Sequence, residues 1–290
     1  MPELPEVEAL VHDLRRRLTD RAIVRVDIAA FSALKTYDPP LSALHGTLVD
    51  DVQRHGKFLD FSASGLHLVV HLSRAGWIRW RDTVPATPPK PSNKSPLAAR
   101  VVLDDDSGLD ITEAGTRKRL AIYLVRDPQE VEGIARLGPD PLADEFTINV
   151  LEGILRGAGR SQVKGVLRSQ SIIAGIGNAY SDELLHAARM SPYKPAVTVA
   201  ESPEDLRTLY DAIRNVLADA VNRSSGLAAS ELKGEKKSHL AVHGRTGEPC
   251  PVCGDTVREV SFADTSLQYC PTCQTGGKPL ADRRTSKFLK

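Results

Sequence analysis

The four cysteines of the chain stand in two pairs with the spacing of a metal site. Cys250 and Cys253 form one C-x2-C pair, and after 16 intervening residues Cys270 and Cys273 form another. Two such pairs place four thiolates around one tetrahedral Zn2+, and the metal stabilises a region with too little apolar material for its own core. Disulfides are the alternative, but no basic and apolar signal segment precedes the fold, which favours a reducing cytoplasm. The sequence therefore predicts one closed, structural zinc site.

The N-terminus has the makings of a nucleophile. Removal of Met1 leaves the secondary amine of Pro2 at the start of the chain, with the carboxylate of Glu3 beside it. A free α-amino group titrates near pH ~8, so a useful fraction is unprotonated at neutral pH and able to attack C1′ of a sugar. Alternatively, Pro2 and Pro5 only open a helix, because proline suits the first helical turn and acidic residues there complement the helix dipole. These residues alone leave both interpretations open.

Composition sets broad limits on the class of protein. A length of 290 residues with 41% apolar and 26% charged residues suits a soluble protein of two or three domains, and no apolar run approaches membrane-spanning length. The formal net charge of +1 does not indicate nucleic-acid binding, so a phosphate-binding surface requires local segregation of charge. Two basic stretches show such segregation, although the alternative is solvated loops and a disordered tail, which is favoured for the tail alone. They contain Lys233, Lys236, Lys237 and Arg245, and Lys278, Arg283, Arg284, Lys287 and Lys290.

The hydrophobic pattern changes along the chain from strands to helices. Apolar residues recur at helical spacing between Glu3 and Leu18, so we expect a helix that holds the N-terminal amine on a rigid element. Short β-rich runs at residues 23–28, 58–61, 66–72, 77–80, 101–103 and 120–125 predict an antiparallel sandwich or barrel, with a long exposed loop at 82–96. After a break at Gly138-Pro139-Asp140-Pro141, helices are expected at 148–155, 162–167, 179–188 and 203–221.

A glycine-rich loop lies between two of the expected helices. Its sequence, Ile173-Ala174-Gly175-Ile176-Gly177-Asn178, permits a tight turn that directs backbone N–H groups toward an anion at the next helix start. A dinucleotide-binding loop does not fit, because a helical segment precedes it and no β-α-β unit surrounds it. The loop is either a phosphate contact or a plain corner between two helices.

Six motifs occur together in one order, and together they resemble one family. They are Pro-Glu-Leu-Pro-Glu-Val-Glu, His-Gly-Lys-Phe-Leu, Leu-Gly-Pro-Asp-Pro-Leu, Ala-Gly-Ile-Gly-Asn, His-Gly-Arg-Thr-Gly-Glu-Pro-Cys and Cys-Pro-Thr-Cys-Gln. The chain resembles the formamidopyrimidine-DNA glycosylase and endonuclease VIII family from Pro2 to Gln274. The resemblance implies a multidomain α+β protein that binds damaged DNA: an N-terminal antiparallel β-sandwich with a leading helix (1–125), a linker (126–144), a helical helix-two-turn-helix domain (145–240), a C-terminal zinc-finger β-hairpin (241–275) and a basic tail (276–290).

The same resemblance assigns roles to individual residues. Pro2 would attack C1′ of a damaged nucleotide that has left the helical stack, release the base and form a Schiff base, with Glu3 as proton donor and acceptor. Lys57, in the turn after Arg54-His55-Gly56, would contact phosphate near the lesion and assist β,δ-elimination. Glu6 would order the active site, although a carboxylate that only caps the first helix has the same sequence signature. Lys164 and Asn178 match positions that grip phosphate without reading sequence.

The chain departs from the family pattern in the loops that fill the gap left by the extruded base. The first gap loop (residues 71–74) carries Arg74 where methionine is usual, and the second (115–119) carries Arg117 and Arg119 in place of an Arg-Phe-Gly run. These arginines stack or pair with the orphaned base, or they only grip phosphate. The finger has Thr265 at the position of a phosphate-binding arginine, for which Lys278 or Arg283 of the tail are candidate substitutes.

Two classes of function remain. The first is a bifunctional DNA glycosylase and abasic-site lyase that acts on oxidised or otherwise damaged bases in base excision repair. The second is a protein that binds damaged DNA or a DNA structure without excising bases, and an intermediate possibility is an enzyme that mainly cleaves abasic sites. We expect damaged DNA as partner, one structural Zn2+, no small-molecule cofactor and no membrane contact, and a monomer located in the cytoplasm, at the nucleoid in a bacterium.

Overall fold

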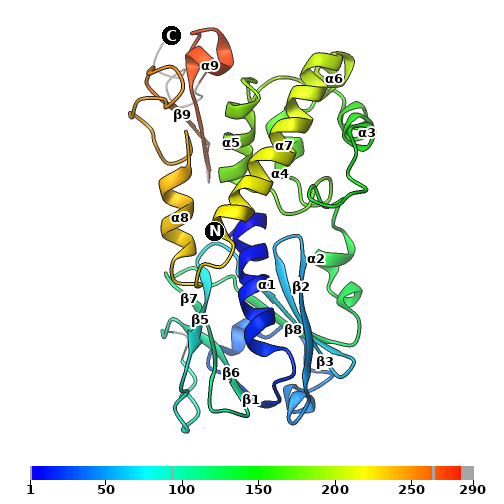
Figure 1. The fold of residues 1–290 in the computed structure, drawn as a ribbon, viewed down its shortest axis with the longest axis vertical. Coiled ribbons are helices and arrows are strands. Elements are labelled where there is room, and N and C mark those ends of the chain that lie inside the picture. The colour runs from blue at the N-terminus through cyan, green and yellow to red at the C-terminus, as the bar shows by residue number, and fades with distance from the viewer. Residues whose placement is uncertain (1, 93, 263–264, 282–290) are drawn as a thin grey trace. The chain divides into compact units, whose positions relative to one another are not determined.

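The computed structural model describes residues 2–92, 94–262 and 265–281 of the chain. These divide into two compact units, one formed by Met1–Leu137 with Arg223–Lys233 and the other by Gly138–Asn222 with Gly234–Lys290 (Figure 1). Among the described residues, no helix combines the length and the apolar character needed to cross a lipid bilayer.

Two four-stranded antiparallel sheets form the body of the first unit. One sheet has the strand order β1-β6-β7-β5 and the other β2-β3-β4-β8. The strands of the first are β1 (Ile23–Ile28), β6 (Leu97–Leu103), β7 (Gly108–Glu113) and β5 (Gly76–Arg81). Those of the second are β2 (Val49–His55), β3 (Phe58–Ala63), β4 (Leu66–His71) and β8 (Ala121–Val125). The antiparallel sandwich expected from the sequence is thus present.

One hydrophobic core joins both sheets and the leading helix of this unit. Helix α1 (Leu4–Leu18) contributes Leu10 and Leu14, which are almost completely buried together with residues of both sheets such as Phe61 and Ile111. The helix contacts β2, and Figure 1 shows it running beside that strand. A short helix, α2 (Glu132–Ala135), adds Ile134 to a separate cluster with residues of β4 and β8. Packing along its whole length therefore fixes α1, and with it the start of the chain.

The second unit is mainly helical and contains one small hairpin near its C-terminal end. Helices α3, α4, α5 and α7 correspond to the four helical segments predicted from periodicity, and α6, α8 and α9 are additional. They are α3 (Ile148–Ala158), α4 (Val163–Arg168), α5 (Asn178–Ala187), α6 (Ala196–Glu201), α7 (Pro203–Ser224, whose last residues belong to the first unit), α8 (Leu232–His239, which starts in the first unit) and α9 (Pro271–Thr275). The hairpin pairs β9 (Arg258–Ser261) with β10 (Ser266–Tyr269).

Sequence periodicity misses two strands of the sandwich, β2 and β7, for physical reasons. In β2 the register shifts between Val49 and Asp51, so the alternation of buried and exposed residues is interrupted. In β7 every residue is buried, including Asp110, because Arg100 on the neighbouring strand donates to its carboxylate at 2.7 and 3.1 Å. A buried ion pair makes a core strand look polar in sequence. The described residues of the segment 82–96 form no strand, in line with the expected loop.

Candidate active site and metal centre

The turn that carries Lys57 lies at one end of the sandwich. Gly56 and Lys57 connect β2 to β3, and Gly56 has φ +56°, a left-handed conformation that glycine adopts without strain. Phe58, the first residue of β3, pairs with His71, the last residue of β4, and His71 also pairs with Ala121 at the start of β8. The same end of the sheet therefore carries Lys57, the first gap loop and the end of the second gap loop.

Both gap loops leave the other sheet at one end as well. Gly76, which starts β5, pairs with Glu113, which ends β7, and Ala114 N donates to Ala75 O at 3.2 Å. The carboxylate of Glu113 accepts the backbone N–H groups of Arg119 at 2.7 Å and Leu120 at 3.0 Å, which fixes the base of the second gap loop. The two loops are thus built as one pair at one end of the first unit.

The cationic side chains predicted on these loops are exposed. Arg74, Arg117 and Arg119 all lie at the surface, and none forms an ion pair with a residue that the structure describes. Their charges are consequently available to an anionic ligand. Whether they contact DNA stays a prediction.

The first turn of α1 is fixed by a reciprocal pair of glutamates. Glu3 is the N-cap, its side chain accepts the backbone N–H of Glu6, and the Glu6 carboxylate accepts the N–H of Glu3 at 2.8 Å. Pro2, Glu3 and Glu6 are all buried. One turn further along, Glu8 accepts a hydrogen bond from Arg54 Nε at 2.5 Å, which ties α1 to the end of β2 that leads to Lys57. The capping role that the sequence left open for Glu6 is present, and it also orders the residue next to Pro2.

Lys57 lies in a poorly solvated environment. Only 7% of the surface of Lys57 is exposed. His71 is a neighbour of Lys57, and the centre of its ring lies 4.6 Å from the centre of the Phe58 ring. Burial, together with the positive charge of Lys57, lowers the pKa of His71 to about 4. His71 is therefore neutral at physiological pH and does not add a second positive charge beside the lysine.

This low pKa predicts a loss of stability in mild acid. Between about pH 6.5 and pH 4 the unfolded chain binds a proton at His71 that the folded chain does not. The contribution of His71 to stability is therefore complete above pH 6.5, is lost progressively as the pH falls toward 4, and is gone below 4. We expect His71→Phe to reduce the difference in unfolding free energy between pH 7 and pH 5 in urea titrations. The same substitution at exposed His45 is the control. An unchanged pH dependence in His71→Phe would contradict the assignment.

In the second unit, Asn178 opens α5 and links it to the hairpin. Its Nδ2 donates to Ser266 O of β10 at 2.7 Å, which uses one of the two N–H groups of that amide. Gly175, with φ +83°, and Gln170 shape the preceding loop, since Gln170 Oε1 accepts Gly175 N–H and Nε2 donates to Ile176 O. The second N–H of Asn178 is the group that suits a phosphate oxygen.

Lys164 is placed differently from what a phosphate contact requires. It is 4% exposed, and its Nζ donates to Asp182 Oδ1 and Ser181 Oγ at 2.6 Å and to Asn178 O at 3.3 Å. These partners occupy its ammonium group within the protein. Lys164 therefore holds the start of α5, and a direct phosphate contact by it stays a prediction.

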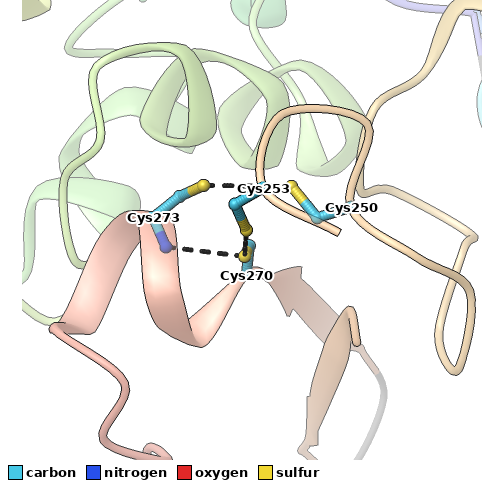
Figure 2. A group of neighbouring side chains, drawn as sticks. All are labelled: Cys250, Cys253, Cys270 and Cys273. Carbon is cyan, nitrogen blue, oxygen red and sulfur yellow. Dashed lines mark hydrogen bonds between the residues drawn. The ribbon is translucent and has the colours of Figure 1, made fainter. Parts of the chain in front are cut away.

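The four cysteines converge from two turns. Cys250 and Cys253 belong to the turn before β9. Cys270 is the N-cap of α9, and Cys273 lies in the first turn of that helix (Figure 2). Their sulfur atoms all lie within 4.8 Å of one another, close to the separation of about 3.8 Å that tetrahedral bonds of about 2.3 Å to Zn2+ require. Four thiolates at this spacing repel one another, so they need a cation between them. The donor set fits zinc.

Three protein-family models match successive parts of the chain. The formamidopyrimidine-DNA glycosylase N-terminal domain matches residues 1–122, the formamidopyrimidine-DNA glycosylase H2TH domain matches 137–231, and the zinc finger found in FPG and IleRS matches 247–276. The formamidopyrimidine-DNA glycosylase of Symbiobacterium thermophilum is 36% identical over 295 residues, covering 98% of this chain and 93% of the relative. The chain belongs to the formamidopyrimidine-DNA glycosylase family.

Further similarities agree with this membership. A formamidopyrimidine-DNA glycosylase-like protein of Mycobacterium tuberculosis is 58% identical over 154 residues, which are 53% of this chain and 94% of that protein. The MutM (Fpg) structure from Thermus thermophilus has a TM-score of 0.79 at 32% identity and covers 96% of this chain and 100% of its own. Lactococcus lactis Fpg in complex with DNA that contains an abasic site has a TM-score of 0.81 at 25% identity and covers 94% and 99%. The fold class and the membership in an enzyme family of DNA repair are thus confirmed.

Membership in the formamidopyrimidine-DNA glycosylase family also settles the metal. The matched zinc-finger segment encloses Cys250, Cys253, Cys270 and Cys273, whose sulfur atoms surround one position, so these residues hold one structural Zn2+. Asp255 links the two turns, because its carboxylate accepts Thr272 N–H at 3.2 Å and Thr272 Oγ1 at 2.8 Å. The expected zinc cofactor is confirmed.

Residues outside the family motifs support the finger, and sequence reasoning missed them. His186 Nε2 lies 3.2 Å from Cys250 Sγ in the core of the unit. The buried carboxylate of Glu183 accepts the N–H groups of Ala241, Val242 and His243 at 2.7 to 3.0 Å. One signal in the sequence could have revealed them, namely the charged and polar residues inside the otherwise apolar helix α5. Buried charges need partners, so such residues indicate contacts with another segment.

The finger position that departs from the family lies in the hairpin turn. Thr265 O accepts Phe262 N–H at 2.7 Å. Lys278, one suggested substitute for the missing arginine, is exposed after α9. Arg283, the other, lies outside the described residues together with Arg284, Lys287 and Lys290.

Proposed function

We propose that the chain is a bifunctional DNA glycosylase and abasic-site lyase that removes damaged bases through a Schiff base at Pro2 and cleaves the strand by β,δ-elimination. The observation that carries this proposal is the fixed position of Pro2. It precedes a helix whose first turn is locked by Glu3 and Glu6, and a hydrogen bond between Glu8 and Arg54 ties that helix to the strand that leads to Lys57. An amine held next to a buried carboxylate suits covalent catalysis.

The proposed reaction begins with attack of the Pro2 nitrogen on C1′. The bond between C1′ and the base breaks, and the base leaves with a proton. The sugar ring opens when Glu3 gives a proton to O4′, and the C1′–nitrogen bond becomes the iminium of the Schiff base. Loss of a proton from C2′ then breaks the C3′–O bond, and loss of a proton from C4′ in a second elimination breaks the C5′–O bond. Hydrolysis of the iminium returns the Pro2 amine.

Glu3 and Lys57 supply the proton transfer and charge stabilisation in this proposal. Glu3 is 2% exposed, so its carboxylate is shielded from water and suited to move a proton at the sugar. Lys57 carries a positive charge in a poorly solvated turn, where it stabilises the leaving phosphate more strongly than it would in water. Because the pKa of His71 is about 4, His71 is neutral, and Lys57 alone carries the positive charge of these two neighbours.

DNA contacts are proposed at the exposed arginines and at Asn178. Arg74, Arg117 and Arg119 occupy the gap loops, and Asn178 has a second N–H for a phosphate oxygen. We assign Lys164 a positioning role, because its partners Asp182 and Ser181 lie in the helix that Asn178 opens. The L. lactis relatives were solved with DNA that contains an abasic site or Fapy-dG, which supports damaged DNA as ligand.

The remaining expectations are proposals of the same kind. We propose domains at residues 1–125, 145–240 and 241–275, joined by the linker 126–144 and followed by the tail 276–290. The family membership supports this order of domains. We further propose that the protein acts as a monomer, without a small-molecule cofactor, on DNA in the cytoplasm.

The ends of the cleaved strand test the proposed lyase step. On a labelled duplex that contains one abasic site, we expect the protein to leave a phosphate at both ends of the gap. Lys57→Ala should slow cleavage by roughly 10²-fold, because it removes the proposed stabilisation of the leaving phosphate. Lys94→Ala, in the exposed segment 82–96, is the matched control. A 3′ hydroxyl product, or equal rates in both variants, would contradict the proposal.

A specific observation supports a second candidate, an enzyme that cleaves abasic sites but excises few bases. The gap loops carry three exposed arginines and no apolar tip, so extrusion of an intact base has less help from an inserted side chain, whereas an abasic site has no base to extrude. Cleavage of abasic duplexes without release of an oxidised purine or pyrimidine would select this candidate.

A further inference from the structure

A pocket of about 450 Å³ opens in the first unit, beside strand β5. Its walls come from the C-terminal part of α1, from β5, and from the segment 228–233. β5 is an edge strand, since it pairs with β7 on one side only, so its other side offers backbone N–H and C=O groups. The volume is in the usual range for sites that hold a small molecule.

Both tryptophans of the chain line this pocket. Trp77 Nε1 donates to Ala229 O at 2.8 Å, which holds the segment 228–233 against β5. Lys233 Nζ lies 4.5 Å from the centre of the Trp77 ring, and Arg17 Cζ lies 5.0 Å from the centre of the Trp80 ring. A cationic side chain therefore lies over one face of each indole. Trp77 is 6% exposed and belongs to the core of the unit, whereas Trp80 is half-buried and packs against that core.

The charges around the pocket are predominantly positive, and only some of them are paired with a carboxylate that the structure describes. Arg17 pairs with buried Asp13 at 3.0 Å, and Arg81 pairs with Asp110 at 2.9 Å. Arg79 and Lys233 form no ion pair with any residue in the described part of the chain. Burial and the nearby Arg79 lower the pKa of Lys233, as expected where two cations share a partly enclosed space. An anion bound between them would relieve this repulsion.

The pocket is separate from the proposed catalytic end. Asp13 and Arg17 lie roughly 14 and 20 Å along α1 from Leu4, given a rise of about 1.5 Å per residue. β5 also leads away from the gap loops, because it starts at Gly76, two residues after the first gap loop, and ends at Arg81 about 16 Å further on. A ligand in the pocket would not compete for Pro2.

We infer that this pocket is a second nucleic-acid site, which binds one nucleotide by stacking its base against an indole and pairing its phosphate with Arg79 and Lys233. Indole faces stack with any base, arginine and lysine pair with phosphate, and edge-strand backbone groups hydrogen-bond to base edges. This combination suits a nucleotide better than an acidic peptide, which has no flat base. The nucleotide is either free or part of a single strand, and neither case depends on the proposed catalytic function.

Intrinsic fluorescence tests the inference, because the only two tryptophans of the chain line the pocket. The full-length protein is titrated with thymidine monophosphate, an undamaged single-stranded oligonucleotide and inorganic phosphate. We expect saturable quenching by the oligonucleotide, with a slope of log K against log salt of about −0.7 for one phosphate contact. The double variant Arg79→Ala with Lys233→Ala should bind at least ~10-fold more weakly, while Arg126→Ala, exposed elsewhere in the unit, should bind normally.

The three probes distinguish the sources of the nucleotide. Quenching by thymidine monophosphate as well as by the oligonucleotide supports a site for free nucleotides, and quenching by the oligonucleotide alone supports a strand-binding site. Three results would overturn the inference: no saturable quenching by either probe, equal binding by the double variant and the parent protein, or equal quenching by inorganic phosphate, which has no base to stack.

Discussion

Glu3→Gln is expected to abolish base excision while the protein still folds and binds DNA. The substitution removes the proton that the proposed reaction gives to O4′, and general acid–base groups of this kind contribute roughly 10² to 10⁴-fold to a rate. Folding should be preserved, because a glutamine oxygen still accepts the N–H of Glu6 that the Glu3 side chain accepts. Single-turnover release of an oxidised base, with binding measured on the same duplex, checks both parts.

The control for this prediction is Glu132→Gln, at an exposed glutamate that pairs only with Arg136 among the described residues, on the surface of α2. It removes one negative charge from the same unit, so a general electrostatic effect on DNA affinity should appear in both variants. If Glu3→Gln excised bases at the parental rate, Glu3 would not be the proton donor. If it also unfolded, the loss of activity would be uninformative, and the urea midpoint of each variant therefore belongs to the experiment.

Cys250→Ser is expected to release the zinc and unfold the finger while the sandwich stays folded. Apart from the cysteines, the small core around the metal contains Val242 and Val257, whereas the core of the first unit includes no described residue of the finger. Structural zinc sites contribute about 10 to 16 kcal/mol of binding free energy, which a cluster of this size cannot replace. Zinc content by atomic emission should fall from one ion per chain to near zero.

Thr272→Ser is the matched control for the zinc prediction. It changes a residue between two ligands but keeps the hydroxyl that donates to Asp255 at 2.8 Å. We expect it to retain its zinc, and we expect the cysteine variant alone to lose affinity for DNA. Hydrogen exchange should show loss of protection in the hairpin of β9 and β10 and unchanged protection in the sandwich. Unchanged zinc content in Cys250→Ser would contradict the four-cysteine site.

The parts of the fold that follow from local pattern could be predicted from the sequence. The helical spacing of Leu4, Leu10 and Leu14 and the paired cysteines are local signals, and the helix and the metal site are both present. β2 and β7 could not be recognised, because a register shift and a buried ion pair with Arg100 conceal their apolar face. Strand register, which places the gap loops at one end of the sandwich, depends on pairing between distant segments.

The sequence alone could not predict which side chains of the site contact one another. The phosphate contact of Lys164 stays a prediction, and the sequence did not indicate that its ammonium group binds Asp182, a partner 18 residues away. His186 beside Cys250 and Ala229 beside Trp77 are separated by 64 and 152 residues. Such contacts arise from tertiary packing and leave no mark on spacing or periodicity.

Borohydride trapping of the protein on a duplex with one abasic site tests the central claim most directly, because the reductant converts an imine into a stable covalent adduct. After removal of Met1, mass mapping should place the DNA adduct at Pro2. Pro2→Gly, which keeps an N-terminal amine, should still be trapped, and a protein with an acetylated N-terminus should not. An adduct at a lysine, or none on any damaged duplex despite tight DNA binding, would contradict the proposed role of Pro2.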